Sequence, residues 1–535
     1  MFRYLYKKIN FFKLKRENEE RFDYRNDNSN GKGIKLSTDL KQNLVMLKDI
    51  LGNSTDIIYR EFYFGENSQV HGALIFLEGL SNKQMINNNI MKPLMYDLKL
   101  WNVSKSLSKN LDYIENTMVS AGNVKRICYI NEIIDACLSG DTIFLMESCN
   151  EAIDIHSKAW EGRGVEEPKT EAVVRGPREG FTETMATNMA LIRRKIKNPN
   201  LAFETMQIGK QTNTSVCLIY LKGVVKPKLV TEVKNRLRKI NTDAILESGY
   251  IEQFIEDDSS SIFPTIGNSE KPDTAAAKIL EGRVCILVDG TPFALTVPML
   301  FVEGFQSAED YYSRPFFASM LRALRFICFE ITVLAPATYV MLTTFHQELI
   351  PTTLLFTMAA GREGVPFPAI MEAGLMVITF EILREAGVRL PRPVGQAVSI
   401  VGALVIGEAA VSAGLVGGLM VIVVALTAIA SFVVPVYTDV CAILRIVYLI
   451  LAGTLGIFGV GVGMLAILVH IVSLRSFGSP YLSPLAPLTD EDIKDSFFRA
   501  PLWKMNTRPR VIGWHNSTRE EEGFEANSSS NKNSN

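Results

Sequence analysis

The feature that most constrains this chain is a long stretch without lysine. Residues 286–480 contain nine arginines and no lysine, and long apolar runs fill most of that stretch. Every lysine of the 535-residue chain lies outside it, in polar and well-charged sequence. This division predicts two solvents, water for the first half of the chain and lipid for most of the second.

Composition and motifs disfavour several classes of protein. Lys and Arg number 56 against 57 Asp and Glu, whereas a nucleic-acid-binding protein normally carries a basic excess. The seven cysteines are irregularly spaced without a C-x-x-C pair, and the five histidines have no metal-ligand spacing. There is no P-loop, no G-x-S-x-G and no H-E-x-x-H. We therefore expect that the chain is not an enzyme and has no catalytic residues. We also expect that it binds no metal, no cofactor and no nucleic acid.

Shifts in composition divide the chain into five parts. We expect a basic disordered arm over 1–35, α/β units over 36–160 and 165–285, a polytopic membrane domain over 286–480, and a tail over 481–535 that is disordered after about residue 517. Arginine clusters flank the apolar segments, and such clusters prefer the cytosolic side. The two α/β units and both termini are therefore expected in the cytosol.

The two α/β units look like copies of one another. ALIFLEGL at 73–80 matches CLIYLKGV at 217–224, an offset of 144 residues. TIFLMESCNEAIDI at 142–155 matches VCILVDGTPFALTV at 284–297, an offset of 142 residues. Two matches in the same order, with nearly equal offsets, predict a duplicated α/β unit.

The membrane domain is expected to be an α-helical bundle with four to six spanning or re-entrant helices. A spanning helix needs about 20 mostly apolar residues. A short piece at 291–302 contains two prolines and is expected to be interfacial or re-entrant, and a charged, proline-interrupted segment over 352–385 is expected to be a broken helix. The last apolar run is too long for one crossing and is either one tilted helix or a tight pair. The candidate spans are 326–345, 394–413, 419–437 and 442–472.

Carboxylates within these apolar segments are the candidate site residues. A charge in the hydrocarbon core costs at least about 2.5 kcal/mol, so Glu408, Glu381 and Glu372 each need a cavity, a partner or an ion pathway. Rings of carboxylates favour cations if copies of the chain surround an axis. The alternatives are structural hydrogen bonds or a position in headgroup water, and Glu381 also lies one turn from Arg384. Arg445 is expected to extend toward the membrane surface.

Glycines punctuate the last apolar run. Gly459 and Gly463 form a G-x-x-x-G pattern, which permits close contact between helices. These two glycines are the candidate helix-packing residues.

Several long motifs carry a resemblance to a known family. The chain resembles the GerA family of spore germination proteins over about residues 40–510, and most closely its germinant-receptor A subunits. The motifs are RLPRPVGQAVSIVGALVIGEAAVSAGLVGGLMVIVVALTAIASFVVP (389–435), GPREGFTE (176–183), NMALIRRKIKNPNL (188–201), EGRVCILVDGTPFALTVP (281–298), LRSFGSPYLSPLAP (474–487) and RAPLWKM (499–505).

The resemblance implies a multi-pass protein of the spore inner membrane. It implies partnership with a transporter-like B subunit and a C lipoprotein, and a homo-oligomer in the lipid that conducts monovalent cations when nutrient is present. It supplies no catalytic residues. Three alternatives stay open: the sister branch of the stage V sporulation protein AF type, a secondary solute transporter, and a non-conducting scaffold for the B and C subunits.

Overall fold

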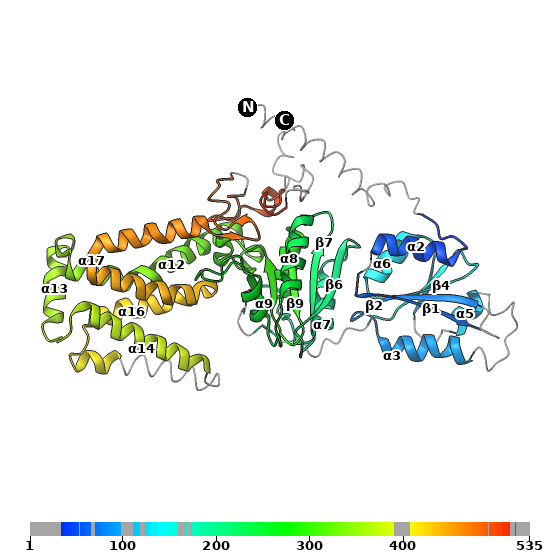
Figure 1. Ribbon diagram of the computed structural model, residues 1–535, viewed down its shortest axis with the longest axis horizontal. Helices are drawn as coiled ribbons and strands as arrows, with labels where there is room; N and C mark the ends of the chain where they lie inside the picture. The colour runs from blue at the N-terminus through cyan, green and yellow to red at the C-terminus, as the bar shows by residue number, and fades with distance from the viewer. Residues whose placement is uncertain are drawn as a thin grey trace, which may run out of the picture. The chain divides into compact units, whose positions relative to one another are not determined.

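The structure is a computed structural model that forms two compact units (Figure 1). The α/β unit comprises Met1–Ser259, Ile266–Met299 and Met505–Asn535, and the helical unit comprises Ser260–Thr265 and Leu300–Lys504. The structure describes residues 34–52, 54–65, 70–97, 111–117, 123–158, 167–168, 171, 173–389, 407–489, 492–513 and 519. Most of the expected arm over 1–35, the tail beyond 519 and most of the candidate span 394–413 lie outside these residues.

The first repeat of the α/β unit is a five-stranded antiparallel sheet in the order β1-β2-β4-β5-β3. Helices cover both of its faces (Figure 1). On one face lie α2 (Leu40–Leu51) and α6 (Ile130–Leu138), and on the other α3 (Lys83–Met85), η3 (Ile86–Met91), η4 (Pro93–Asp97) and α5 (Leu111–Thr117). The strands are β1 (Ile57–Phe64), β2 (Val70–Leu77), β3 (Val124–Ile127), β4 (Thr142–Met146) and β5 (Ala152–Ile155).

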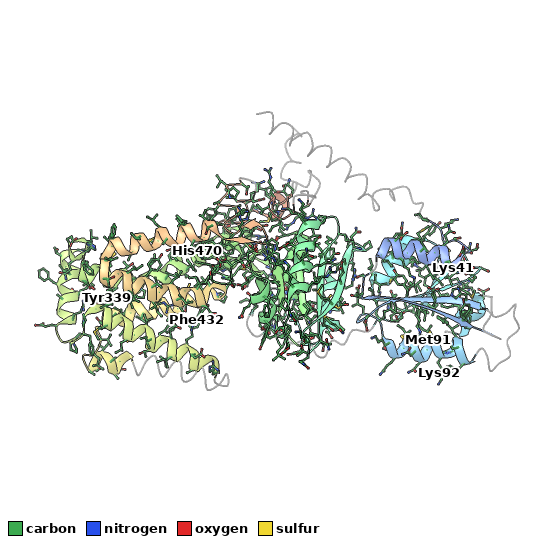
Figure 2. The ribbon with its side chains drawn as sticks, viewed as in Figure 1. Lys41, Met91, Lys92, Tyr339, Phe432 and His470 are labelled. Carbon is green, nitrogen blue, oxygen red and sulfur yellow. The ribbon has the colours of Figure 1, made fainter. Side chains whose placement is uncertain are left out.

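Local sequence explains these helices. Helix α2 begins after Asp39, whose carboxylate accepts hydrogen bonds from the amides of Lys41 and Gln42. Helix α6 buries apolar residues at helical spacing, from Ile130 to Leu138. On the other face Met91 is buried against the sheet while its neighbour Lys92 is exposed (both labelled in Figure 2). Each helix therefore presents one apolar stripe to the sheet.

The second repeat has the same architecture. Its antiparallel sheet has the order β6-β7-β9-β10-β8. Helices α7 (Met185–Lys195) and α10 (Pro272–Leu280) pack on one face, while α8 (Pro227–Lys239) contacts the other, where Lys234 pairs with Glu204 at 2.6 Å. Helix α9 (Ser248–Ile255) follows α8. The strands are β6 (Leu201–Ile208), β7 (Thr214–Leu221), β8 (Gly267–Ser269), β9 (Val284–Val288) and β10 (Ala294–Val297).

The structure confirms the duplication predicted from the sequence. Strands β1 and β2 recur as β6 and β7 at an offset of 144 residues, and β4 and β5 recur as β9 and β10 at an offset of 142. The strand order is the same in both sheets. The two sequence matches therefore mark equivalent strands.

Two expectations at the end of the second repeat are wrong. The boundary expected at residue 285 falls inside β9, and the sheet continues to Val297. The segment 291–302, expected to be interfacial or re-entrant, includes β10, which pairs with β9 and β8. Its apolar residues and prolines suggested lipid, but Ala294 and Leu295 are buried in the protein core instead.

The helical unit is built around α12 (Pro315–Thr344) (Figure 1). One apolar cluster joins α12 to α17 (Thr438–Ser473) and η6 (Phe301–Phe305), and a second joins it to α13 (Thr352–Arg362), α14 (Ala369–Arg389) and α16 (Gly418–Ser431). Smaller elements are α11 (Glu309–Tyr312), η7 (Gln347–Leu349), η8 (Pro435–Tyr437), β11 (Arg475–Ser476), β12 (Ser479–Pro480) and η9 (Leu502–Lys504). The expected domain end at residue 480 thus falls at the end of the β11–β12 hairpin.

Among the described residues, two segments are long and apolar enough to cross a membrane. They are Pro315–Thr344 and Pro435–Ser473, and α16 is a shorter apolar helix. Helix α12 begins eleven residues before the expected span 326–345. Helix α16 ends at Ser431, so the expected span 419–437 is shorter than a full crossing, about 21 Å at 1.5 Å per residue.

Helix α17 consists of two arms that meet at Gly456. Gly456 has φ 60° and ψ −140°, a backbone conformation that only glycine adopts readily. A Cβ atom placed on Gly463 would lie 2.9 Å from side-chain atoms of Tyr448 and Leu451, which a continuous helix would hold about 18–22 Å away. The chain therefore reverses at Gly456. Of the two alternatives for the last apolar run, the structure has the tight pair.

Candidate functional site

Glu372 lies in the first turn of α14 and its side chain is completely buried. Its Oε1 accepts a hydrogen bond of 2.6 Å from the amide of Gly417, the residue that precedes α16. Its Oε2 lies 3.7 Å from Nε of Arg362, at the end of α13. A carboxylate at the amino end of a helix is stabilised by the helix dipole. Glu372 therefore joins the break between α13 and α14 to the start of α16.

Glu381 lies further along α14 and forms ion pairs with two arginines. Its Oε2 pairs with Nη2 of Arg384 at 2.9 Å, which is one of the alternatives that their one-turn spacing left open. Its Oε1 pairs with Nη1 of Arg445 at 3.0 Å, and Nε of Arg445 donates to the carbonyl of Thr332 at 3.0 Å. The Arg445 side chain is 2 % exposed. The expectation that Arg445 extends toward the membrane surface is therefore wrong, because its partner Glu381 lies inside the helical unit.

Glu408 has a different environment from the other two carboxylates. It lies in the short helical stretch over 407–412 and is exposed. The structure thus brings Glu372 and Glu381 into arginine pairs within the chain and leaves Glu408 open to its surroundings.

The candidate packing glycines lie in the second arm of α17. The contacts that a Cβ on Gly459 or Gly463 would make are with Tyr448, Leu451 and Leu455, all in the first arm of the same element. The two glycines thus lie at the interface between the two arms.

Sequence reasoning missed a buried ionic network at the start of the helical unit. Arg322 is fully buried and donates to Asp310 at 2.9 Å and to Asp495 at 2.7 Å, and Arg325 pairs with Asp310 at 2.8 Å. Arg322 and Arg325 belong to one of the arginine clusters that were expected to mark the cytosolic side. The partners of Arg322 lie 12 and 173 residues away and that of Arg325 lies 15 residues away, and no spacing rule marks such pairs.

The described residues contain no group of three or more His, Cys, Asp or Glu side chains that could hold a metal ion. All seven cysteines are free, and five of them are buried. The arrangement that remains is a set of carboxylates and arginines among apolar helices. Chemically it can pair charges, bind small polar molecules or contact cations.

Comparison with known proteins identifies the family. Residues 45–511 match the family described as Bacillus/Clostridium GerA spore germination protein. The chain belongs to this family. The resemblance seen in the sequence motifs is thereby confirmed.

Individual relatives agree with this assignment. "Spore germination protein KA" of Bacillus subtilis (strain 168) is 46% identical over 489 residues, which are 91% of this chain and 89% of the relative. "Spore germination protein GerLA" of Bacillus cereus is 41% identical, over 91% of this chain and 98% of the relative. A solved structure, the N-terminal domain of the A subunit of the Bacillus megaterium spore germinant receptor GerK3, is 36% identical and covers 50% of this chain and 98% of its own, with a TM-score of 0.40.

Proposed function

We propose that this GerA-family chain is the A subunit of a spore nutrient germinant receptor. In this proposal copies of the chain oligomerise in the spore inner membrane and form a nutrient-gated channel whose release of monovalent cations triggers germination. The observation that carries the proposal is the family match over residues 45–511, because it spans both the α/β unit and the apolar helices.

The proposed topology places the apolar helices in the membrane as a multi-pass domain. Helix α12 and the two arms of α17 supply apolar segments, and each arm is about 25 Å long at 1.5 Å per residue. The α/β unit and both termini would then lie in the cytosol. The basic sequence before residue 35 would be able to contact anionic lipid headgroups.

Glu408 is our first candidate for the cation pathway. It is exposed in the single chain, and a ring of such carboxylates around an oligomer axis would favour cations over anions. Glu372 and Glu381 stay candidates, but each would reach a pathway only after leaving its arginine partner. Gly459 and Gly463 are proposed to keep the two arms of α17 in close contact.

The proposed partners are the transporter-like B subunit and the C lipoprotein of the receptor, in addition to further copies of this chain. Nutrient binding to the B subunit would shift the oligomer toward the open state. The α/β unit would supply contacts between neighbouring A subunits.

The strongest rival is a non-conducting scaffold for the B and C subunits. It is favoured by one observation: Glu372 and Glu381 are both paired with arginines, as structural carboxylates are. A scaffold predicts that charge-neutralising substitutions of Glu408 leave ion release unchanged.

Potassium release from spores tests the proposal. Spores with this chain and its B and C partners are compared with spores that lack only this chain, over a panel of candidate nutrients. We expect nutrient-dependent potassium release that is lost without the chain and restored by its gene. Normal release without the chain, for every nutrient that acts on the complete receptor, would contradict the proposal.

A further inference from the structure

Three polar side chains meet where the chain breaks between α13 and α14. Arg362 ends α13, Glu372 lies in the first turn of α14, and Tyr339 comes from α12. Tyr339 (labelled in Figure 2) packs in the same buried cluster as Met358 of α13 and Ala373 of α14. The Glu372 side chain is completely buried, and Tyr339 is 7 % exposed. The cluster is therefore an internal site of the helical unit.

Each of the three side chains has a polar atom whose hydrogen-bonding capacity is unused. Within the described part of the chain, Nε of Arg362, Oε2 of Glu372 and the hydroxyl of Tyr339 are buried and make no hydrogen bond. The 3.7 Å between Nε and Oε2 is too long for a direct hydrogen bond. Buried polar atoms are nearly always satisfied, because leaving one unpaired costs about 1–3 kcal/mol. Two such atoms 3.7 Å apart, with a third on a residue of the surrounding buried cluster, point to a guest molecule.

The charges at the site define what kind of guest fits. A cation would be repelled by the guanidinium of Arg362, and an anion by the carboxylate of Glu372. A small neutral molecule that both donates and accepts hydrogen bonds is compatible with both charges. The three atoms offer one donor, one acceptor and one hydroxyl, and a buried water typically makes about three hydrogen bonds.

The site lies where two helices of the unit are joined. The other oxygen of Glu372 accepts from the amide of Gly417, so the same carboxylate contacts both the guest site and the start of α16. A Cβ atom on Gly417 would lie 3.2 Å from that oxygen, which is close contact. A Cβ atom on Gly414, three residues earlier, would lie 3.1 Å from the carbonyl oxygen of Gly364 in the broken segment. Glu372 thus bonds the start of α14 to the residue before α16, and the segment over 363–368 passes close to the loop that precedes α16.

We propose that Tyr339, Arg362 and Glu372 bind an ordered water molecule, and that this hydrated site is a latch that holds the broken segment to the start of α16. Opening the latch would free the Glu372 carboxylate and the segment together. The contacts described above are the evidence for the hydrated site itself. The role of the latch in channel opening rests on the proposed function.

X-ray hydroxyl-radical footprinting tests the water site, since bound water is converted to radicals where it lies and labels the side chains around it. We use the full-length chain, purified in detergent, and compare Tyr339 with Tyr437. Tyr437 is also buried, but its hydroxyl donates to the carbonyl of Phe301. We expect Tyr339 to be labelled and Tyr437 to be protected. Equal protection of both tyrosines would overturn the water site.

Hydrogen exchange tests the latch independently of receptor activity. Glu372→Gln keeps the size of the side chain and removes its charge, and Glu385→Gln is the matched control because Glu385 lies on the same helix in an exposed pair with Arg389. We expect amides of 363–368 and 414–418 to exchange at least about tenfold faster in the Glu372 variant only. Tyr339→Phe should give a smaller increase at the same segments. Unchanged exchange in both Glu372→Gln and Tyr339→Phe would overturn the latch.

Potassium release from spores that carry these variants tests the latch as a step in gating. If deletion of the chain abolishes nutrient-dependent release, we expect Glu372→Gln spores to release potassium without nutrient while Glu385→Gln spores do not. Wild-type behaviour of Glu372→Gln in that case overturns the gating role and leaves the proposed function intact. If deletion has no effect, the proposed function fails, and the exchange experiment still decides the latch.

Discussion

Two buried carboxylates of this protein, Asp56 in the α/β unit and Glu372 in the helical unit, each lie beside a guanidinium, but the two pairs differ in geometry. In the α/β unit, Arg193 of the second repeat donates to both oxygens of Asp56 at the start of the first sheet, at 2.8 and 3.0 Å. Arg193 also donates to the carbonyls of Asn198 and Leu201 and to the hydroxyl of Ser54. In the helical unit, Glu372 and Arg362 approach only to 3.7 Å.

The difference suggests two uses of a buried charge. A fully hydrogen-bonded pair has one favourable arrangement, and Asp56 and Arg193 thereby join the two repeats. A partly satisfied pair can exchange its protein partner for water, or for another partner, at little cost. We therefore regard the first pair as a fixed joint and the second as a place where the structure can change.

Breaking the fixed joint should have the largest effect. Arg193→Ala leaves Asp56 buried without its counter-charge and should lower the free energy of unfolding of the α/β unit by about 3–5 kcal/mol. The measurement is urea unfolding of the full-length chain in detergent, followed by pulse proteolysis of the α/β unit. Replacing both residues by leucine should recover much of the loss. A double variant as unstable as Arg193→Ala would show that the loss is not due to an unpaired charge.

Glu381 should behave as a fixed joint although it lies among apolar helices. Glu381→Gln removes the charge that Arg445 binds and should destabilise the helical unit by about 1.5–3 kcal/mol. Thermal unfolding in detergent gives the shift. Glu385→Gln breaks an exposed pair and should cost at most about 0.5 kcal/mol. Equal shifts in both variants would remove the distinction between buried and exposed pairs.

The arms of α17 should tolerate an added methyl group at one glycine and not at another. Gly463→Ala would place Cβ 2.9 Å from Tyr448 and Leu451 and should cost about 1–3 kcal/mol. Gly461→Ala meets no atom within 4 Å and should be neutral or stabilise the helix by up to about 1 kcal/mol. Thermal unfolding of both variants in detergent provides the comparison. Similar effects at the two positions would contradict the hairpin at Gly456.

The smallest expected effect is a pH dependence of the α/β unit. Burial, followed by the charges of Glu256 and Glu247, raises the pKa of Glu252 in α9 from 4.5 to about 7. The native state therefore binds more protons than the unfolded state between these values, so stability falls as the pH rises from about 5 to 7. We expect a loss of about 1 kcal/mol, because Glu252 is partly exposed. Urea unfolding at several pH values should show a flatter dependence for Glu252→Gln, and an equal slope would refute the assignment to Glu252.

Much of the α/β unit, including its duplication, could be predicted from the sequence. Short apolar runs mark strands whose two faces are both buried, and the duplication repeated that signal at nearly equal offsets. The end of the second repeat was misplaced because β10 combines apolar residues with flanking prolines, a composition shared with membrane segments. Its partner strand β9 ends six residues before β10 begins. The same sequence is therefore also compatible with a β-hairpin, which is what the structure has.

Only some residues of the candidate site, and few of their partners, could be predicted from the sequence. The sequence singled out Glu372, Glu381 and Glu408 because a carboxylate in an apolar segment needs an explanation, and its spacing offered the Glu381–Arg384 pair as one alternative. It could not find the partner of Glu381 that lies 64 residues away, Arg445, since only the packing of α14 against α17 brings them together. Whether each of these three carboxylates is buried or exposed also depends on the tertiary structure.

Cation flux through reconstituted protein tests the central claim most directly. The chain is placed in liposomes with its B and C partners, and potassium flux is measured with and without nutrient, for wild type, Glu408→Gln and Glu408→Lys. The account predicts nutrient-dependent flux that changes in rate or ion preference with glutamine and falls strongly with lysine. Complete receptors that respond to nutrient in spores but pass no potassium in liposomes, or flux that ignores both substitutions, would contradict it.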